Sequence, residues 1–588
     1  MLAIPFAERV QPLPRTFPLT VIARDPRVTD RRSSDPARQI LVAEVPVPAS
    51  RLEPGPRGPR FHVVDFNAST GKLGPATNLA PGRKPAPGWG FRDRFRKATD
   101  RELLESAHFR AQNVYAVAAR TLASFEFALG RPIPWAFGAP QLYLVPTAFA
   151  EPNAFYADDD QALYFGYFPD GEETVYTALA HDIVAHETTH AILDGLRRRF
   201  DTPALPDQAG FHEGISDVVA LLSLLSSPAS TGALLGDPTR VRIDASSVTE
   251  DRLKESVLFT LGKEFGDALH LNRGGGLRRS VTQEPTKEWR DPTRREWDEP
   301  HRRGEIFAAA VMRTFVRLWA QRLSELIGGG TLDRRRAAEE GASLARHLLE
   351  MVIRAIDYCP PVEFEFDDFL GALLVSDQEL APDDERGYRE AITSVFGSFG
   401  ITAIMGEPLV ASASNQAPSY RNFSYASLRS DPDEAFRFIW DNVGLLDVRP
   451  RFYTHVEHVR PSMRVGPRGF VVAETVVDYV QELIISRADL DTLARQDATE
   501  FASPASIPAD TQLKVWGGGT LIFDEFGGLK FHHVKPLWDW GRQQRRLEFL
   551  VRRGLWDTKK RLGFSLGVPL GQRFAQAHEP VETLGEQW

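Results

Sequence analysis

The pattern of apolar and polar positions changes period several times along the 588-residue chain. Runs that alternate β-branched and polar residues predict strands, whereas apolar residues spaced three and four apart predict amphipathic helices. The strand-like runs are 40–47, 61–66, 141–168 (two strands around a polar turn), 470–485, 513–523 and 529–534. The helical runs are 100–130, 174–200, 213–226, 304–327, 333–356, 366–376 and 383–399. This mixture predicts an α+β protein.

Segments rich in Pro, Gly and Ser divide the chain into parts. Residues 1–37 lack periodicity and predict an extended or disordered arm, and 38–99 form a β-rich N-terminal region. The mainly helical block spans 100–405. After the linker-like segment ASASNQAPSYRNFSYAS, residues 425–588 predict an α+β C-terminal domain whose role the sequence does not define.

Composition then narrows the class of protein. A hydrophobic share of 42% and a charged share of 25% are those of an ordinary globular chain. Because 70 basic residues face 79 acidic ones, the net charge of -9 has the wrong sign for a dedicated nucleic-acid binder, and we expect no such partner. The first residues show no signal-peptide pattern and no apolar run is long enough to span a bilayer. We therefore expect a cytoplasmic protein without a membrane span.

The single cysteine, Cys359, limits the metal chemistry that the chain can support. One thiol excludes an internal disulfide and any site that needs two thiolates. A metal ion in this chain must therefore be held by histidine and carboxylate side chains.

The segment AHDIVAHETTHAILDG places His186, Glu187 and His190 in an HExxH pattern. Residues four apart lie on one face of a helix, so both imidazoles can occupy adjacent corners of a zinc tetrahedron. Glu187 lies about 100° round the helix, within reach of a water on the metal. The flanking residues are uncharged, as the packing of a helix into a protein interior requires. An exposed helix face that carries these residues by chance is the alternative.

A second apolar helical run supplies a third ligand. Glu213, in FHEGISDVVALL, follows His190 by 23 residues, and Asp217 lies four positions further on the same face. Glu213 is therefore the candidate ligand, and Asp217 the candidate acceptor for the outer ring N–H of a ligand histidine. The alternative is a carboxylate that caps the start of a helix, where acidic residues are common.

These two motifs together resemble the thermolysin-like gluzincin metallopeptidases. Weaker similarities follow in the same order: the helix that starts at Ala107, the strand that starts at Asn153, Asp194 in HAxxD, and His301 before Gly304 at the start of a helix. The resemblance implies a two-lobed fold over residues 100–405, with a mixed β N-terminal lobe and a mainly helical C-terminal lobe. The additional α+β domain would follow this fold.

The resemblance also implies roles for individual residues. His186, His190 and Glu213 would bind one Zn²⁺, and Glu187 would act as general base on the zinc-bound water in peptide-bond hydrolysis. His301 would donate to the oxyanion, with Asp298 or Glu299 as its orienting partner. The implied contacts to a peptide or protein substrate come from Asn153, Ala154 and one of the pair Arg278 and Arg279.

The sequence departs from the family pattern in two places. Asp182 occupies a position that helps to bind a double calcium site in the family, but the helix after Glu213 lacks the acidic residues that would complete it, so we predict no calcium site. The family's tyrosine oxyanion donor has no counterpart in RRRFDTPALPDQAGF. A zinc-binding scaffold without turnover, and an adaptor that binds a protein partner through the C-terminal domain, therefore remain as alternative functions.

Overall fold

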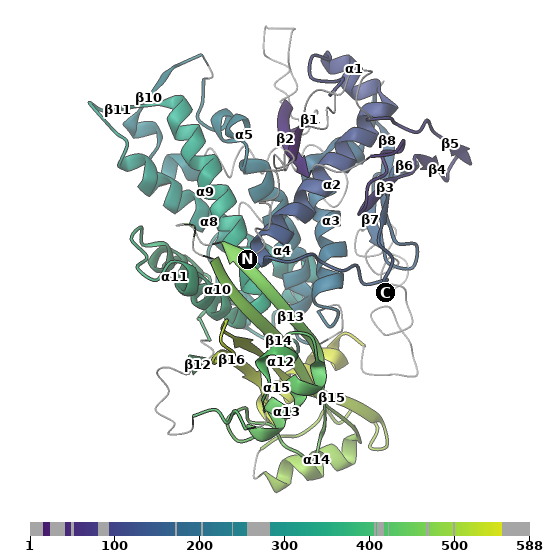
Figure 1. The fold of residues 1–588 in the computed structure, drawn as a ribbon, viewed down its shortest axis with the longest axis vertical. Helices are drawn as coiled ribbons and strands as arrows, with labels where there is room; N and C mark the ends of the chain where they lie inside the picture. Colours follow the sequence, from purple (N-terminus) through teal and green to yellow (C-terminus); the bar gives the residue numbers. More distant parts are fainter. Residues whose placement is uncertain are drawn as a thin grey trace, which may run out of the picture.

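A computed structural model of the chain describes most of the residues that the sequence motifs involve. The described ranges are 16–23, 42–48, 52–79, 93–170, 173–200, 204–237, 239–255, 283–404, 407–408, 417–421, 423–465, 469, 471–497 and 500–554. Within them the protein is α+β, with one mixed sheet, a large helical body and a separate antiparallel sheet near the C-terminus (Figure 1).

The N-terminal sheet is mixed, and it ends beside the helix that carries HExxH. Its strands follow the order β3-β6-β8-β7, with β9 also paired to β8. Their bounds are β3 Phe61–Val63, β6 Leu142–Phe149, β7 Ala154–Ala157, β8 Ala162–Asp170 and β9 Glu173–Tyr176. The pairs β3–β6 and β6–β8 are parallel, whereas β7 and β9 run antiparallel to β8. The strand β7 is therefore an end strand of this sheet.

A long buried helix links this sheet to the helical body. The run 100–130 forms α1 (Asp100–Glu105) and α2 (Ala107–Leu129), because Ser106 accepts from Phe109 N and caps a new helix between them. Gly130, with φ of 67°, ends α2 in the left-handed conformation that glycine adopts readily. The strand β1 (Thr16–Ile22), within the expected N-terminal arm, pairs with β2 (Val42–Pro48), and both lie against α2.

The helical body carries most of the hydrophobic core. Its helices are α3 His181–Leu196, α4 Pro206–Leu225, α5 Pro228–Ala233, α8 Pro300–Ser324, α9 Arg334–Ala355, α10 Phe366–Leu380 and α11 Tyr388–Ser398, with the short pair β10 (Arg242–Asp244) and β11 (Thr331–Asp333) at one end. The helices α4 and α8 approach closely at three glycines: a Cβ on Gly304 would lie 2.7 Å from both Gly210 O and Gly214 N. Because glycine has no side chain, the two backbones can pack this closely.

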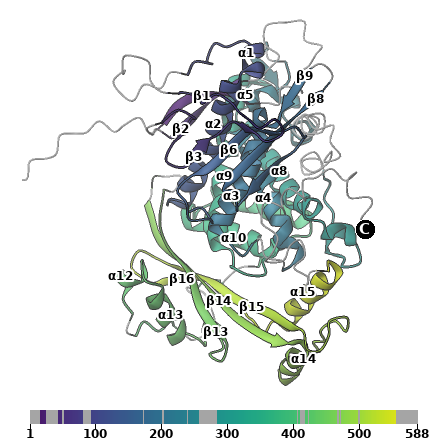
Figure 2. The same ribbon diagram turned by 90° about the vertical axis from the view of Figure 1, so that its right-hand side faces the viewer.

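The C-terminal sheet is antiparallel and packs against the helical body (Figure 2). It has the order β12-β16-β15-β14-β13, with β12 Glu407–Pro408, β13 Tyr453–Val465, β14 Val471–Ser486, β15 Gln512–Phe523 and β16 Leu529–Lys535. Val476, Ile522 and Phe531 belong to the same core cluster as the helical body. The helices α12 (Tyr425–Leu428) and α13 (Pro432–Asp441) pack near one end of the strands, and α14 (Arg487–Gln496) and α15 (Trp540–Arg552) near the other.

The structure corrects two helix boundaries that bear on the site. The expected helix 174–200 is wrong at its start, because β9 and a 3₁₀ turn (Thr177–Leu179) occupy 173–179 and α3 begins only at His181. The helix that carries Glu213 begins at Pro206, not at Glu213. A capping role for Glu213 is therefore excluded, since this residue lies two turns inside α4.

None of the helices that the structure describes has both the length and the apolar character needed to cross a bilayer.

Candidate metal centre

The helix α3 presents its histidines to the protein interior and not to solvent. His186, Glu187 and His190 are 8%, 2% and 0% exposed. The two threonines between them donate their hydroxyls to carbonyls one turn earlier, Thr188 to Val184 O at 2.6 Å and Thr189 to Ala185 O at 2.8 Å. These bonds satisfy the hydroxyls, so the helix can be buried on nearly all sides. The alternative of an exposed helix face is wrong.

Three potential ligand atoms converge between α3 and α4. His186 Nε2 lies 3.0 Å from His190 Nε2, and Glu213 Oε2 lies 3.6 Å and 3.8 Å from these two nitrogens. Ligands about 2.05 Å from a tetrahedral zinc ion are about 3.3 Å apart, so the observed triangle has the size of one face of that tetrahedron. The donor set and its geometry therefore fit one metal ion, and all three residues are buried.

Asp217 supports His186 from the side opposite the ligand atoms. Its Oδ1 lies 3.0 Å from His186 Nδ1, which leaves Nε2 directed at His190 and Glu213. Burial acts to lower the pKa of His186, but Asp217 and Glu213 outweigh it and hold that pKa well above its ordinary value. The structure thus brings Asp217 to the position expected of a carboxylate that orients a ligand imidazole.

His190 is supported by a residue that the sequence analysis missed. His212 Nδ1 lies 2.9 Å from His190 Nδ1, and the two rings stack at 13° with their centroids 5.1 Å apart. Burial lowers the pKa of His190 well below its ordinary value, and the nearby histidines add to the effect while Glu213 opposes it. The only signal in the sequence was the position of His212 directly before Glu213.

His301 enters the site from the start of α8. Its Nε2 lies 3.4 Å from Glu213 Oε2, and its Nδ1 lies 2.7 Å from Glu299 Oε1. Glu299 caps α8 by accepting from His301 N and Arg302 N. Burial acts to raise the pKa of Glu299, but His301 and these amides lower it to about 2. Of the two expected orienting residues, Glu299 contacts His301, whereas Asp298 bonds to Arg552.

The expected substrate-binding residues lie at the sheet edge beside α3. Asn153 precedes β7, is buried, and its Oδ1 accepts from Ala154 N at 2.8 Å. The buried Tyr156 of β7 donates to Asp194 of α3 at 2.9 Å, which ties the end strand to the HExxH helix. Arg278 and Arg279 lie outside the described residues.

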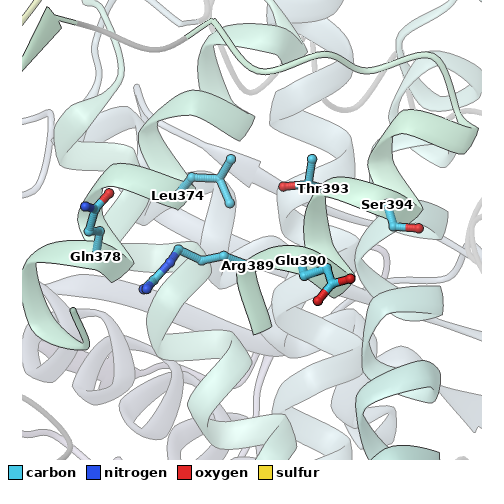
Figure 3. Close-up of a pocket in the computed structure, with 6 residues that line it drawn as sticks. All are labelled: Leu374, Gln378, Arg389, Glu390, Thr393 and Ser394. Carbon is cyan, nitrogen blue, oxygen red and sulfur yellow. The ribbon is translucent and has the colours of Figure 1, made fainter. Parts of the chain in front are cut away.

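Other parts of the described structure do not add a second centre. Among the described residues, the side chains that lie close enough together to hold a metal ion are those of His186, His190 and Glu213. Asp182 is not part of this group. A surface hollow lies between α10 and α11, lined by Leu374, Gln378, Arg389, Glu390, Thr393 and Ser394 (Figure 3). Its lining shares no residue with the metal-ligand group.

Over the residues that the structure describes, the fold and the site define an α+β protein with a buried His–His–Glu group suited to a metal ion. Comparison of the sequence with models of known protein families gives no match, and comparison with curated proteins gives none either. The function is therefore inferred from the geometry of this chain.

Proposed function

We propose that the protein is a zinc-dependent peptidase of the thermolysin-like type, in which His186, His190 and Glu213 hold the metal. The observation that carries the proposal is the buried triangle of ligand atoms with Glu187 in the same turn of α3. Two imidazoles and one carboxylate from the chain, with a fourth position left for water or substrate, form the ligand set of catalytic zinc sites. Structural zinc sites use four protein ligands.

Bound zinc would supply Lewis acidity, which activates a water molecule and polarises the scissile carbonyl. Glu187 takes the proton of the attacking water and passes it to the leaving amine. Its place one residue after His186, about 100° round α3, suits this task because it would lie beside a bound metal without belonging to the ligand triangle. The carboxylate is 2% exposed, so few waters compete for that proton.

His301 has the geometry of an oxyanion donor. Glu299 Oε1 accepts from Nδ1, so Nε2 is directed at the region beside Glu213, where it can donate when His301 is the doubly protonated imidazolium. A donor of this kind contributes roughly 3 kcal/mol to transition-state binding. This contribution compensates in part for the absence of a tyrosine from the described residues that lead into α4.

The substrate would bind as an added strand along β7. This strand ends the mixed sheet, and it lies against α3 through Tyr156 and Asp194. An extended peptide added to such an edge bonds through its main chain, which suits peptides of varied sequence. Asn153 and Ala154, at the start of β7, would align the peptide so that one carbonyl reaches the metal.

The test combines metal analysis with peptide-cleavage profiling of the full chain. We expect one zinc per wild-type chain and cleavage of a peptide library. Glu187→Gln should retain zinc but lose at least about 100-fold in kcat, because a general base contributes roughly that much. Glu390→Gln, an exposed residue on α11, is the matched control and should behave as wild type.

Two other outcomes would identify the alternative functions. Stoichiometric zinc without cleavage of any peptide would identify a metal-binding scaffold without turnover. A cellular activity that survives Glu187→Gln but is lost on disruption of the C-terminal region would identify an adaptor. Equal cleavage by wild type and Glu187→Gln, or a chain without zinc, would refute the proposal.

A further inference from the structure

The C-terminal unit, defined here as the described residues between 417 and 554, meets the helical body through buried charges as well as apolar contacts. The helical body contributes Arg197, Asp357, Glu363 and Asp368, and the unit contributes Arg460, Arg464, Asp478, Lys535 and Arg542. Removal of one member of a buried pair costs about 3–5 kcal/mol, because its partner stays buried without compensation. The interface therefore differs from the polar, separable contact between independent domains.

One part of this interface lies at the end of the HExxH helix. Arg460 of β13 donates through Nη1 to Leu196 O, the last residue of α3, at 3.0 Å. Arg197, the next residue, donates to Asp478 Oδ2 of β14 at 2.7 Å, and Arg460 also pairs with Asp478. A helix C-terminus carries unsatisfied carbonyls and a partial negative charge, which a guanidinium neutralises. The last turn of α3 is thus held by two strands of the C-terminal sheet.

Asp478 is in turn fixed from a third strand. Thr520 Oγ1 of β15 donates to Asp478 Oδ1 at 2.7 Å, and the carboxylate is 1% exposed. The two oxygens of Asp478 therefore serve different partners. A carboxylate with both oxygens engaged cannot swing away from Arg197 without breaking a buried bond.

A second contact lies at the segment that carries His301. Arg552, at the end of α15, donates to both oxygens of Asp298, at 3.0 Å through Nε and 3.4 Å through Nη2. Asp298 directly precedes Glu299, which caps α8 and binds His301 Nδ1. A bidentate arginine–carboxylate pair restricts orientation as well as distance. The entry into α8 is thus attached to the C-terminal unit.

We propose that the C-terminal unit positions the metal site from two sides, through Arg460 and Asp478 at the end of α3 and through Arg552 at the segment that carries His301. Arg460 and Arg552 are positioning residues, because they act on the ligand helix and on His301 through other groups. The part that concerns turnover rests on the proposed function. The part that concerns metal affinity and local mobility does not.

The first test uses Arg552→Gln in the full-length chain, with Arg553→Gln as the control. Arg552 is the last residue of α15 and Arg553 is its C-cap, and both substitutions remove one charge. Arg553 is exposed and is not part of the contact to Asp298. In Arg552→Gln we expect faster hydrogen exchange at residues 296–305, a loss of about ten-fold in kcat with KM little changed, and zinc affinity within about two-fold of wild type. Arg552→Lys, which keeps the charge, should recover part of kcat.

The second test addresses the end of α3 through zinc affinity, measured by competition with a chromophoric chelator. We expect Arg460→Gln to weaken zinc binding by roughly ten-fold, the effect of loosening support around a ligand, and to speed exchange in 190–197. Arg449→Gln is the control, because Arg449 pairs with Asp497 inside the C-terminal unit. Should Arg460→Gln fail to fold, Arg460→Lys tests the same contact. Its zinc affinity should be lower than that of wild type and of Arg449→Gln, but zinc binding should remain measurable.

The proposal is overturned if Arg552→Gln matches Arg553→Gln in exchange and kcat, or if folded Arg460 variants bind zinc as Arg449→Gln does. A wild-type chain without peptidase activity would refute the proposed function alone. In that case zinc affinity and hydrogen exchange still decide whether the C-terminal unit positions the site.

Discussion

Replacement of His212 tests how the second ligand histidine is oriented. When both Nε2 atoms bind a metal, His190 carries its proton on Nδ1, and His212 Nδ1 at 2.9 Å is the nearest acceptor. His212→Phe keeps a ring of similar size in the stack with His190 but removes the acceptor. His212→Asn keeps an acceptor oxygen while it gives up the ring. The pair of variants therefore separates hydrogen bonding from packing.

The expected size of the effect follows from the surroundings of His190. A buried N–H without an acceptor costs about 1–3 kcal/mol, which corresponds to roughly 5–150-fold in metal affinity. Ser216 Oγ lies 3.5 Å from the same nitrogen, so it compensates only in part. We therefore expect zinc binding about ten-fold weaker in His212→Phe and within about three-fold of wild type in His212→Asn.

The assay is competition for zinc with a chromophoric chelator, supported by nitrogen-15 NMR of the imidazoles. His347→Phe is the control, since His347 lies far along the chain from the ligand group and packs against Tyr388 with the two rings tilted by 50°. This change also replaces one ring by another. The NMR spectrum should show His190 protonated on Nδ1 in the zinc form. Equal zinc affinity in His212→Phe and wild type, or an equal loss in His212→Phe and His212→Asn, would show that His212 is not the acceptor.

Three further predictions concern stability. Gly304→Ala should destabilise the protein by about 1–3 kcal/mol in urea unfolding and weaken zinc binding, because the new Cβ would lie 3.1 Å from Glu213 Cβ. The control Gly397→Ala has open space around the new Cβ and should be neutral or slightly stabilising. Burial lowers the pKa of His181 to about 4, so its neutral form stabilises the fold above its ordinary pKa of 6.5 and this stability is lost as the pH falls toward 4. Between about pH 7 and about pH 5 the loss is about 2 kcal/mol, and a His181→Asn chain should lack that part of the pH dependence. Asp357→Asn leaves Arg131 and Arg464 without their shared carboxylate and should lower the free energy of unfolding by about 3–5 kcal/mol in the same assay. The control Asp497→Asn removes a partly exposed pair and should lower it by at most about 1 kcal/mol.

The candidate ligands were predictable from the sequence because their pairing on each helix depends on local spacing. His186 and His190 are one helical turn apart, and Asp217 is one turn after Glu213, so helix geometry alone puts each pair on one face. The start of α4 was missed because the segment 201–210, with two prolines and Gly210 at its end, is typical of a loop. In the structure this glycine allows the close approach of α8, where a Cβ would lie 2.5 Å from Arg303 Cγ. In the sequence, a glycine that is required for close helix packing could not be distinguished from a glycine that marks a turn.

The strand β13 was missed for a different reason. Its sequence, YTHVEHVRPSMRV, places arginines at 460 and 464, which favour an exposed segment when the sequence is considered alone. In the structure Arg464 is instead buried against Asp357 of the helical body, and Arg460, whose side chain is 11% exposed, pairs with Asp478 of the neighbouring strand β14. His212 was missed likewise, since its partner His190 is set by the packing of α3 on α4. Pairings of this kind depend on the fold, so no local pattern reveals them.

The charged interface between the C-terminal unit and the helical body also has a consequence for biosynthesis. Arg197 and its partner Asp478 are 281 positions apart, so at about 5–20 residues per second a ribosome needs roughly 14–56 seconds to make the second after the first. During that interval Arg197 has no carboxylate from β14, and the end of α3 has no strand to hold it. A nascent chain therefore carries the HExxH segment well before it can complete the surroundings of that segment, and the end of α3 gains its full support only after β13 and β14 have been made.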